Sequence, residues 1–218
     1  MAAAISGLLV ILGYLLGSIP TGYLIVRLIK GIDIRQQGSG STGATNVLRT
    51  VGKMAAIAVL IIDILKAVLA VGIVKLLYIF SPLDIIPLDW KYWLMIAAAI
   101  AAIVGHSKSI FLNFTGGKSV ASSLGVLLVL NPLVALGALA SFLLMLAITR
   151  IVSLSSITGA IAVNILMIVL NQPLPYLLFS VLAGIYVIIR HKNNISRIIQ
   201  GTEPKIGQKL QEEANTMS

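Results

Sequence analysis

The sequence predicts an all-α integral membrane protein with seven transmembrane helices. Of the 218 residues, 58% are hydrophobic and only 11% are charged, whereas a soluble domain carries about 25% charged residues. The mean hydropathy is +1.03. Seven apolar stretches follow one another, and most basic residues fall in alternate connections between them. Such a chain has too few charges to cover a water-exposed surface, so lipid is its expected solvent.

Most of the predicted helices are apolar stretches close to the length that a bilayer requires, about 20 residues with a range of about 17–25. The third is short but begins with the interfacial pair Tyr92 and Trp93. The first contains a Gly-Ser-Ile-Pro interruption at residues 17–20. The fourth has only 11 residues, so part of it is expected to be re-entrant or covered by other helices. The seven are Ile5–Ile29, Met54–Phe80, Tyr92–Gly105, Val120–Leu130, Leu133–Thr149, Ile151–Leu170 and Leu174–Ile189.

The basic residues predict the orientation of these helices. With seven spans, the connections after the odd-numbered spans share one face, and this face holds 13 of the 16 Lys and Arg residues. The positive-inside rule places that face in the cytoplasm, with the N-terminus outside and the C-terminus inside. The 13 are Arg27, Lys30, Arg35, Arg49, Lys53, Lys108, Lys118, Arg150, Arg190, Lys192, Arg197, Lys205 and Lys209.

The remaining charges are few. Lys75 and Lys91 lie toward the opposite face with Asp84 and Asp89, and Asp63 and Lys66 lie inside the second span. Ionisable groups within a span are costly and are often functional. Since Asp63 and Lys66 are three residues apart, a structural ion pair and a catalytic role are equally compatible with the sequence.

Composition also excludes several kinds of site. The chain has no cysteine and two histidines, which excludes disulfides, thiolate metal sites and His-rich metal clusters. The net charge of +9 in so apolar a chain favours membrane topology or an anionic substrate over nucleic acid. The first apolar run lacks a preceding basic segment, so it is interpreted as a retained helix. We expect one domain over residues 1–207 and a polar, disordered tail over 208–218.

The first polar motif is Gly-Ser-Gly-Ser-Thr-Gly-Ala-Thr-Asn at residues 38–46. Its three glycines allow the backbone to approach a ligand closely, and successive N–H groups in such a loop can bind an anion. Arg49 and Lys53 follow at a spacing of four, on one helical face. It is not a Walker loop, since no Gly-Lys-Ser/Thr ends it. The alternative is a flexible loop with a basic flank.

The second motif extends from Gly105 to Ala121 and contains Gly116-Gly117-Lys118, which again combines a close-approach backbone with a cation. Ser119 follows where a helix can begin, so the helix N-terminus could face an anion. A loop with one snorkelling lysine is the simpler alternative. His106 lies near the start of this motif, and by itself it is more typical of a structural histidine than of a catalytic one.

The third motif is Arg-His-Lys-Asn-Asn-Ile-Ser-Arg at residues 190–197, followed by Gly-Thr-Glu-Pro-Lys at 201–205. Spacings of four and three place Arg190, Asn194 and Arg197 on one helical face, with His191 beside them. The alternative is a basic stop signal after the last span. A smaller patch, Ser153, Ser155 and Ser156, opens the sixth span next to Arg150.

In this order, the motifs resemble those of the bacterial acyl-phosphate:glycerol-3-phosphate acyltransferase family. The resemblance also covers the Asp63–Lys66 helix and the Ser153–Ser156 patch, and so extends over nearly the whole chain. It implies a multi-pass enzyme of the bacterial inner membrane with a cytoplasmic active site. The implied reaction transfers an acyl group from acyl phosphate to the 1-hydroxyl of glycerol 3-phosphate, giving lysophosphatidic acid and phosphate. The resemblance implies no cofactor, metal or nucleic acid. The expected partners are the two substrates and membrane lipid, and the protein is expected to function as a monomer.

The resemblance and the chemistry together assign the site residues. The expected catalytic residues are His191, Asn194, Lys118 and Ser39. Glycerol 3-phosphate is expected to be surrounded by His191, Asn194 and Lys118 together with Arg49 and Ser156. Acyl phosphate is expected against the first motif. The full set of expected substrate-binding residues is Arg49, Lys118, Ser156, His191, Asn194, Gly38, Gly40, Ser41, Gly43, Thr45, Asn46, Gly116 and Gly117.

The proton from the attacking hydroxyl needs an acceptor. Other glycerolipid acyltransferases have a His followed five residues later by an Asp, but Phe111 and Ser196 stand five residues after the two histidines here. We therefore expect His191 to orient the glycerol and a substrate phosphate oxygen to accept the proton. The chain also departs from the family pattern, which usually has Asn at Ser41, an aromatic residue and Pro at Lys108 and Ser109, and Gly at Ser119.

Two other classes of function share some of these features. A carrier for organic phosphates would also use broken helices and basic loops, but it needs access from both faces. Here the outer connections, residues 81–91 and 171–175, have no matching set of cations. A scaffold without chemistry is less compatible with so many Gly, Ser and Asn residues in the loops.

Overall fold

The computed structural model describes residues 1–80 and 85–208, and in these residues every regular element is a helix. Asp84, Lys209 and nearly all of the predicted tail lie outside the described residues. The helices are α1 (Ala2–Ser18), α2 (Thr21–Lys30), η1 (Ile34–Gln36), α3 (Ala44–Thr50), α4 (Lys53–Phe80), η2 (Leu88–Trp90), α5 (Lys91–Ser107), η3 (Ile110–Leu112), α6 (Val120–Leu130), α7 (Pro132–Thr149), α8 (Val152–Val169), α9 (Leu174–Arg190) and α10 (Lys192–Ile199).

Each of the seven predicted apolar stretches is helical, the first as the two helices α1 and α2, so the chain is an all-helical membrane protein. By length and apolar character, five segments of the described chain could cross a bilayer, or six if α9 and α10 count as one bent span. The 11 residues of α6 extend about 16 Å, well below the roughly 30 Å of a hydrocarbon core. Length alone therefore supports five to six spans rather than the seven that the sequence predicted.

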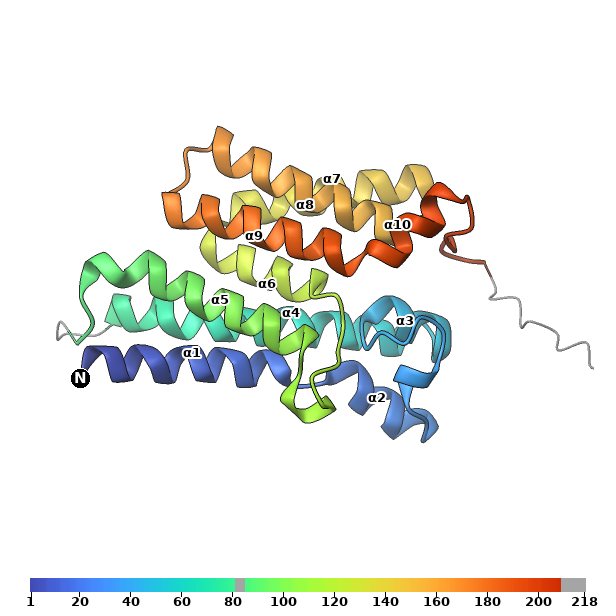
Figure 1. The fold of residues 1–218 in the computed structure, drawn as a ribbon, viewed down its shortest axis with the longest axis horizontal. Helices are drawn as coiled ribbons and strands as arrows, with labels where there is room; N and C mark the ends of the chain where they lie inside the picture. Colours follow the sequence, from blue (N-terminus) through green and yellow to red (C-terminus); the bar gives the residue numbers. More distant parts are fainter. Residues whose placement is uncertain (81–84, 209–218) are drawn as a thin grey trace, which may run out of the picture.

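The helices pack around one large apolar core (Figure 1). In that view α1, α4 and α5 form one group, α7, α8 and α9 form another, and α6 lies between them. Because α6 contacts helices of both groups, its backbone is covered by protein, which a short helix in a bilayer requires. The short helices α2, α3 and α10 lie together at one end of the bundle, so the polar motifs gather there as the sequence predicted.

The predicted interruption of the first span separates α1 from α2 at Ile19 and Pro20. The carbonyl groups freed by this break have partners inside the protein. The Nζ of Lys66 donates to the Ile19 carbonyl at 2.8 Å, and the Oγ of Ser109 donates to the Ser18 carbonyl at 2.5 Å. Unpaired backbone groups are costly in a bilayer, so these two side chains stabilise the break.

A second, smaller core fixes the segment between α2 and α4. Val26, Ile34 and Val47 are fully buried and pack with Val59 and two alanines of α4. These contacts hold α2, η1 and α3 against the first turns of α4. The loop at residues 37–43 is therefore anchored at both ends, which gives the first polar motif a defined position.

Candidate active site

The centre of the candidate site is a chain of hydrogen bonds that joins Lys118 to Asn194 and Glu203. The Nζ of Lys118, in the connection between α5 and α6, donates to Oδ1 of Asn194 on α10 at 2.5 Å. The Nδ2 of Asn194 donates to Oε1 of Glu203 at 2.6 Å. Two predicted site residues that are 76 positions apart are thus in direct contact.

Glu203 is the residue on which these contacts converge, and its role was not predicted. Its carboxylate is buried and also accepts hydrogen bonds from the Oγ of Ser153 at 2.8 Å and from the Nε of Arg197 at 2.7 Å. A signal was present in the sequence, because Glu203 is the acidic residue within the strongly basic third motif. Burial alone would raise its pKa, but these three hydrogen bonds and the charge of Arg197 hold it below the usual value.

Arg49 reaches the same segment from α3. Its guanidinium donates to the carbonyl of Pro204, the neighbour of Glu203, at 3.3 Å. Burial lowers its pKa, while the charge of Glu203 opposes that shift. The residues at 203–204 therefore connect α3, α8 and α10, and Asn194 links the Lys118 loop to them.

Lys118 is a cation in a strongly positive and partly buried environment. Burial is the main reason that its pKa falls from 10.5 to about 8, and the charges of Arg197, Arg49 and Arg190 lower it further. Glu203 provides the opposing effect. Four cations around one carboxylate leave a positive excess, and a dianionic ligand would neutralise it.

His191 lies beside this cluster as a neutral imidazole at physiological pH. Its Nδ1 is 2.7 Å from the Val187 carbonyl, and the ring is buried. Burial lowers the pKa of His191 to about 4, with further lowering by Lys118 and Arg190. Because the carbonyl can only accept, we assign the proton to Nδ1, which leaves the lone pair of Nε2 free to accept from a hydroxyl.

The third motif does not form one continuous helix, which corrects the prediction that Arg190, Asn194 and Arg197 share a helical face. The axis bends by 60° between α9 and α10, at His191. Asn194 and Arg197 both contact Glu203 from α10. Arg190 instead ends α9 and donates to the carbonyls of Gly117 at 2.9 Å and Gly116 at 3.5 Å.

The first motif forms a compact loop held by one side chain. Asn46 is buried at the start of α3; its Oδ1 accepts from the Ser39 N–H at 3.1 Å, and its Nδ2 donates to the carbonyls of Gln37 and Ser41, both at 2.9 Å. Gly38 and Gly40 have φ values of 53° and 68°, which favour glycine. The amide of Asn46 is therefore directed into the loop, while the side chain of Ser39 is exposed.

The other predicted residues lie nearby with less direct contacts. Ser156 is buried on α8, three residues after Ser153, and its Oγ donates to the Val152 carbonyl at 2.8 Å. The Oγ of Ser41 accepts from the Gly43 N–H, and Thr45 is half-buried in the first turn of α3. The described structure thus joins Arg49, Lys118 and Asn194 through the Glu203 segment, whereas the hydrogen bonds of the first motif are mainly internal.

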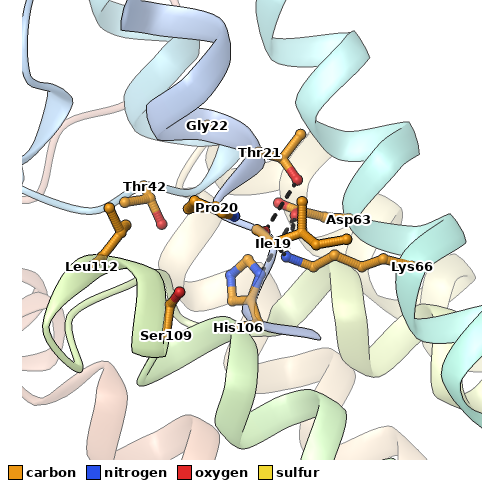
Figure 2. A pocket seen from close by; sticks show the side chains of 10 residues that line it. All are labelled: Ile19, Pro20, Thr21, Gly22, Thr42, Asp63, Lys66, His106, Ser109 and Leu112. Atoms are coloured by element: carbon orange, nitrogen blue, oxygen red, sulfur yellow. Dashed lines mark hydrogen bonds and ion pairs between the residues drawn. The ribbon is translucent and has the colours of Figure 1, made fainter. Parts of the chain in front are cut away.

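Figure 2 shows a second polar cluster, at the break between α1 and α2. The Nζ of Lys66 lies 2.9 Å from Oδ1 of Asp63, so the ion pair that the spacing allowed is formed. The Nδ1 of His106 lies 3.5 Å from the same oxygen. All three side chains are buried. Among the described residues, no group of three or more His, Asp and Glu side chains is arranged to hold a metal ion.

Several known proteins are similar to this chain. The family model described as Glycerol-3-phosphate acyltransferase matches residues 7–201. A protein of that name from Rippkaea orientalis is 82% identical over 217 residues, covering 100% of both chains. Another from Synechocystis is 60% identical over 202 residues, covering 93% of this chain and 91% of the relative.

Two solved structures are also similar. One is the crystal structure of PlsY (YgiH), an integral membrane glycerol 3-phosphate acyltransferase, in its glycerol 3-phosphate form. It has a TM-score of 0.83 and 35% identity, and the match covers 93% of this chain and 96% of that one. The lysophosphatidic acid form of the same protein has a TM-score of 0.81, with 93% and 95% covered.

Proposed function

Because the chain belongs to the glycerol-3-phosphate acyltransferase family, we propose that it transfers an acyl group from acyl phosphate to the 1-hydroxyl of glycerol 3-phosphate at the Lys118–Asn194–Glu203 site. The products are lysophosphatidic acid and inorganic phosphate. The observation that carries the assignment is the convergence of Arg49, Lys118, Arg190 and Arg197 on one small region. This positive excess suits a small dianionic acceptor.

The phosphate of glycerol 3-phosphate binds to Lys118 and Arg49 in this proposal. Lys118 donates to Asn194 Oδ1 and Arg49 donates to the Pro204 carbonyl, and both acceptors are uncharged. A phosphate oxygen can replace either acceptor or bind the same cation beside it. Glu203 keeps Asn194 and Arg197 in place from behind. Ser156, one turn from Ser153 on α8, contacts the substrate from the same side.

In the chemical step, the 1-hydroxyl oxygen attacks the acyl carbon of acyl phosphate. A new ester C–O bond forms, the C–O bond of the mixed anhydride breaks, and phosphate leaves with the bonding pair. With a pKa of about 4, His191 is too weak a base to accept most of the hydroxyl proton at neutral pH. Its Nε2 orients the hydroxyl, and a phosphate oxygen takes the proton. Since acyl phosphate is already activated, positioning and charge stabilisation supply most of the rate.

The acyl phosphate head binds the loop at residues 38–46. The N–H groups of Ser39, Gly40 and Gly43 donate within the loop, so the donors for the head are the exposed hydroxyl of Ser39 and the N–H groups of Ser41 and Thr42. Asn46 contributes by shaping the loop. The acyl tail lies between helices in the lipid phase.

The proposed topology has seven spans in a single domain, residues 1–207, with the N-terminus outside and the C-terminus in the cytoplasm. In this topology α6 is the short span, covered by α4, α5, α7 and α9. The site then faces the cytoplasm of a bacterial inner membrane, where glycerol 3-phosphate and acyl phosphate are available, and one monomer contains every residue named.

A purified-protein assay tests the proposal. The protein in detergent or vesicles is supplied with acyl phosphate and radiolabelled glycerol 3-phosphate, and labelled lysophosphatidic acid is expected with equimolar phosphate release. Acyl-CoA, tested in parallel, should give no product. Exchange of glycerol 3-phosphate across vesicles without product formation would support a carrier and overturn the proposal.

A further inference from the structure

The polar cluster at the α1–α2 break reaches the active site through His106. This histidine lies in the last turn of α5, and it is buried. Its ring faces α4 on one side, where Nδ1 lies 3.5 Å from Asp63 Oδ1. The active-site contacts described above do not include Asp63, Lys66 or His106.

On its other side the imidazole lies directly against Gly117. A methyl group added to the α-carbon of Gly117 would collide with Nε2 of His106. The Gly117 N–H also donates to the carbonyl of His106 at 3.2 Å. Since Arg190 donates to the Gly117 carbonyl from α9, Gly117 is clamped between α5 and α9, immediately before Lys118.

Asp63 lies beside the imidazole of His106, and Lys66 fixes the position of Asp63. The Nζ of Lys66 contacts both Oδ1 of Asp63, at 2.9 Å, and the Ile19 carbonyl, at 2.8 Å. The carboxylate that faces His106 is therefore fixed to the break between α1 and α2, and Figure 2 shows the three side chains meeting there. One ring nitrogen of His106 thus has a fixed polar neighbour, and the other lies against the Gly117 backbone.

We propose that His106 is a positioning residue, whose imidazole sets the Gly116–Gly117 turn so that the ammonium of Lys118 is aimed at the substrate phosphate. Asp63 and Lys66 orient the imidazole. The inference rests on the proposed function, because binding of glycerol 3-phosphate is its main readout. It also assigns the ion pair in α4 to the geometry of the active site rather than to the chemical step.

Steric coupling between positions 106 and 117 provides the test. Gly117→Ala should raise the KM for glycerol 3-phosphate by about tenfold or more, with the KM for acyl phosphate nearly unchanged. If the clash is with the His106 ring, His106→Ser removes it. The Gly117→Ala change should then cost less than about threefold in the His106→Ser background.

Gly116→Ala is the matched control. A methyl group at Gly116 would collide with the carbonyl oxygen of His106, which His106→Ser leaves in place. This change should therefore cost the same in both backgrounds. Equal costs of Gly117→Ala in the two backgrounds would overturn the proposal, and so would an equal rise in the KM values of both substrates.

A second measurement separates this proposal from the proposed function. Direct titration of glycerol 3-phosphate and thermal unfolding are recorded for the same variants. If the unaltered protein neither binds glycerol 3-phosphate nor forms product, the proposed function fails. The unfolding temperatures then still report whether His106→Ser relieves the Gly117→Ala clash. If His106→Ser does not fold, His106→Asn, which shortens the side chain but keeps it polar, replaces it.

Discussion

The ammonium group of Lys118 lies 2.5 Å from the side-chain oxygen of Asn194, and the amide nitrogen of the same asparagine lies 2.6 Å from Glu203. Asn194 thus uses its acceptor toward a cation and its donor toward an anion. The pair of contacts aligns a lysine loop, a short helix and the C-terminal segment. In the proposed site, it would determine how the positive excess is presented to glycerol 3-phosphate.

Asn194→Ala should lower kcat/KM for glycerol 3-phosphate by about 100-fold. The change leaves Lys118 and Glu203 without a shared partner, and an unsatisfied buried group costs about 1–3 kcal/mol. Steady-state kinetics in detergent measure the loss. Asn193→Ala is the control, since Asn193 is the exposed neighbour on the same helix, and equal losses in the two variants would contradict the role given to Asn194.

Deprotonation of Lys118 should produce the alkaline limb in the pH profile of the KM for glycerol 3-phosphate. Its pKa of about 8 means that the cation is present at neutral pH and is lost as the pH rises through 8. The KM for glycerol 3-phosphate should be nearly flat from pH 6.5 to 7.5, where the substrate is already mainly a dianion, and should rise by up to about tenfold per pH unit above 8. Lys118→Arg should move this limb beyond pH 10, since arginine stays protonated.

His191 should add no limb between pH 5 and 9 to that profile, because its pKa of about 4 keeps the ring neutral over this range. A limb that persists near pH 8 in a Lys118→Arg enzyme with measurable turnover would contradict the assignment to Lys118.

Asn46→Ala should loosen the first loop. This buried side chain connects the Ser39 N–H with the carbonyls of Gln37 and Ser41, so its loss leaves three backbone groups of the loop without their partner. We expect a loss of about 3 kcal/mol in stability and a rise in the KM for acyl phosphate. Thermal unfolding and kinetics measure both effects. Gln36→Ala, an exposed change on the segment before the loop, should leave both unchanged.

Two serines should respond to alanine substitution in opposite ways. Ser109 is buried and donates to the Ser18 carbonyl at the break after α1, so Ser109→Ala should destabilise the protein by about 1–3 kcal/mol. The Oγ of Ser123 on α6 is buried without a hydrogen-bond partner, so Ser123→Ala should be neutral or slightly stabilising. Equal changes in unfolding temperature would refute the role of Ser109 in capping α1.

Ser109 and Ser119 also show how the structure uses two departures from the family pattern. Ser109 stabilises the α1 break, as described above. Ser119, where the family usually has glycine, has a φ of 61°, in the region that favours glycine. Its Oγ donates to the Ile103 carbonyl at 2.9 Å, a contact that glycine could not make.

The sequence by itself determined the helical membrane class, the position of each apolar helix, the break before Pro20 and the family. These features depend on local composition and on motif order, which can be read directly along the chain. It also indicated that the Gly-rich and basic motifs would gather at one end, because charge segregation between alternate connections reflects topology.

Only the tertiary structure decided how those motifs meet. The 60° bend at His191 separates Arg190 from Asn194, and Glu203 becomes the common partner of α8 and α10. The inward direction of Asn46 and the contact of His106 with Gly117 were equally absent from the residue pattern. The physical reason is that hydrogen bonding and steric contact between residues tens of positions apart depend on helix packing, which local periodicity does not encode.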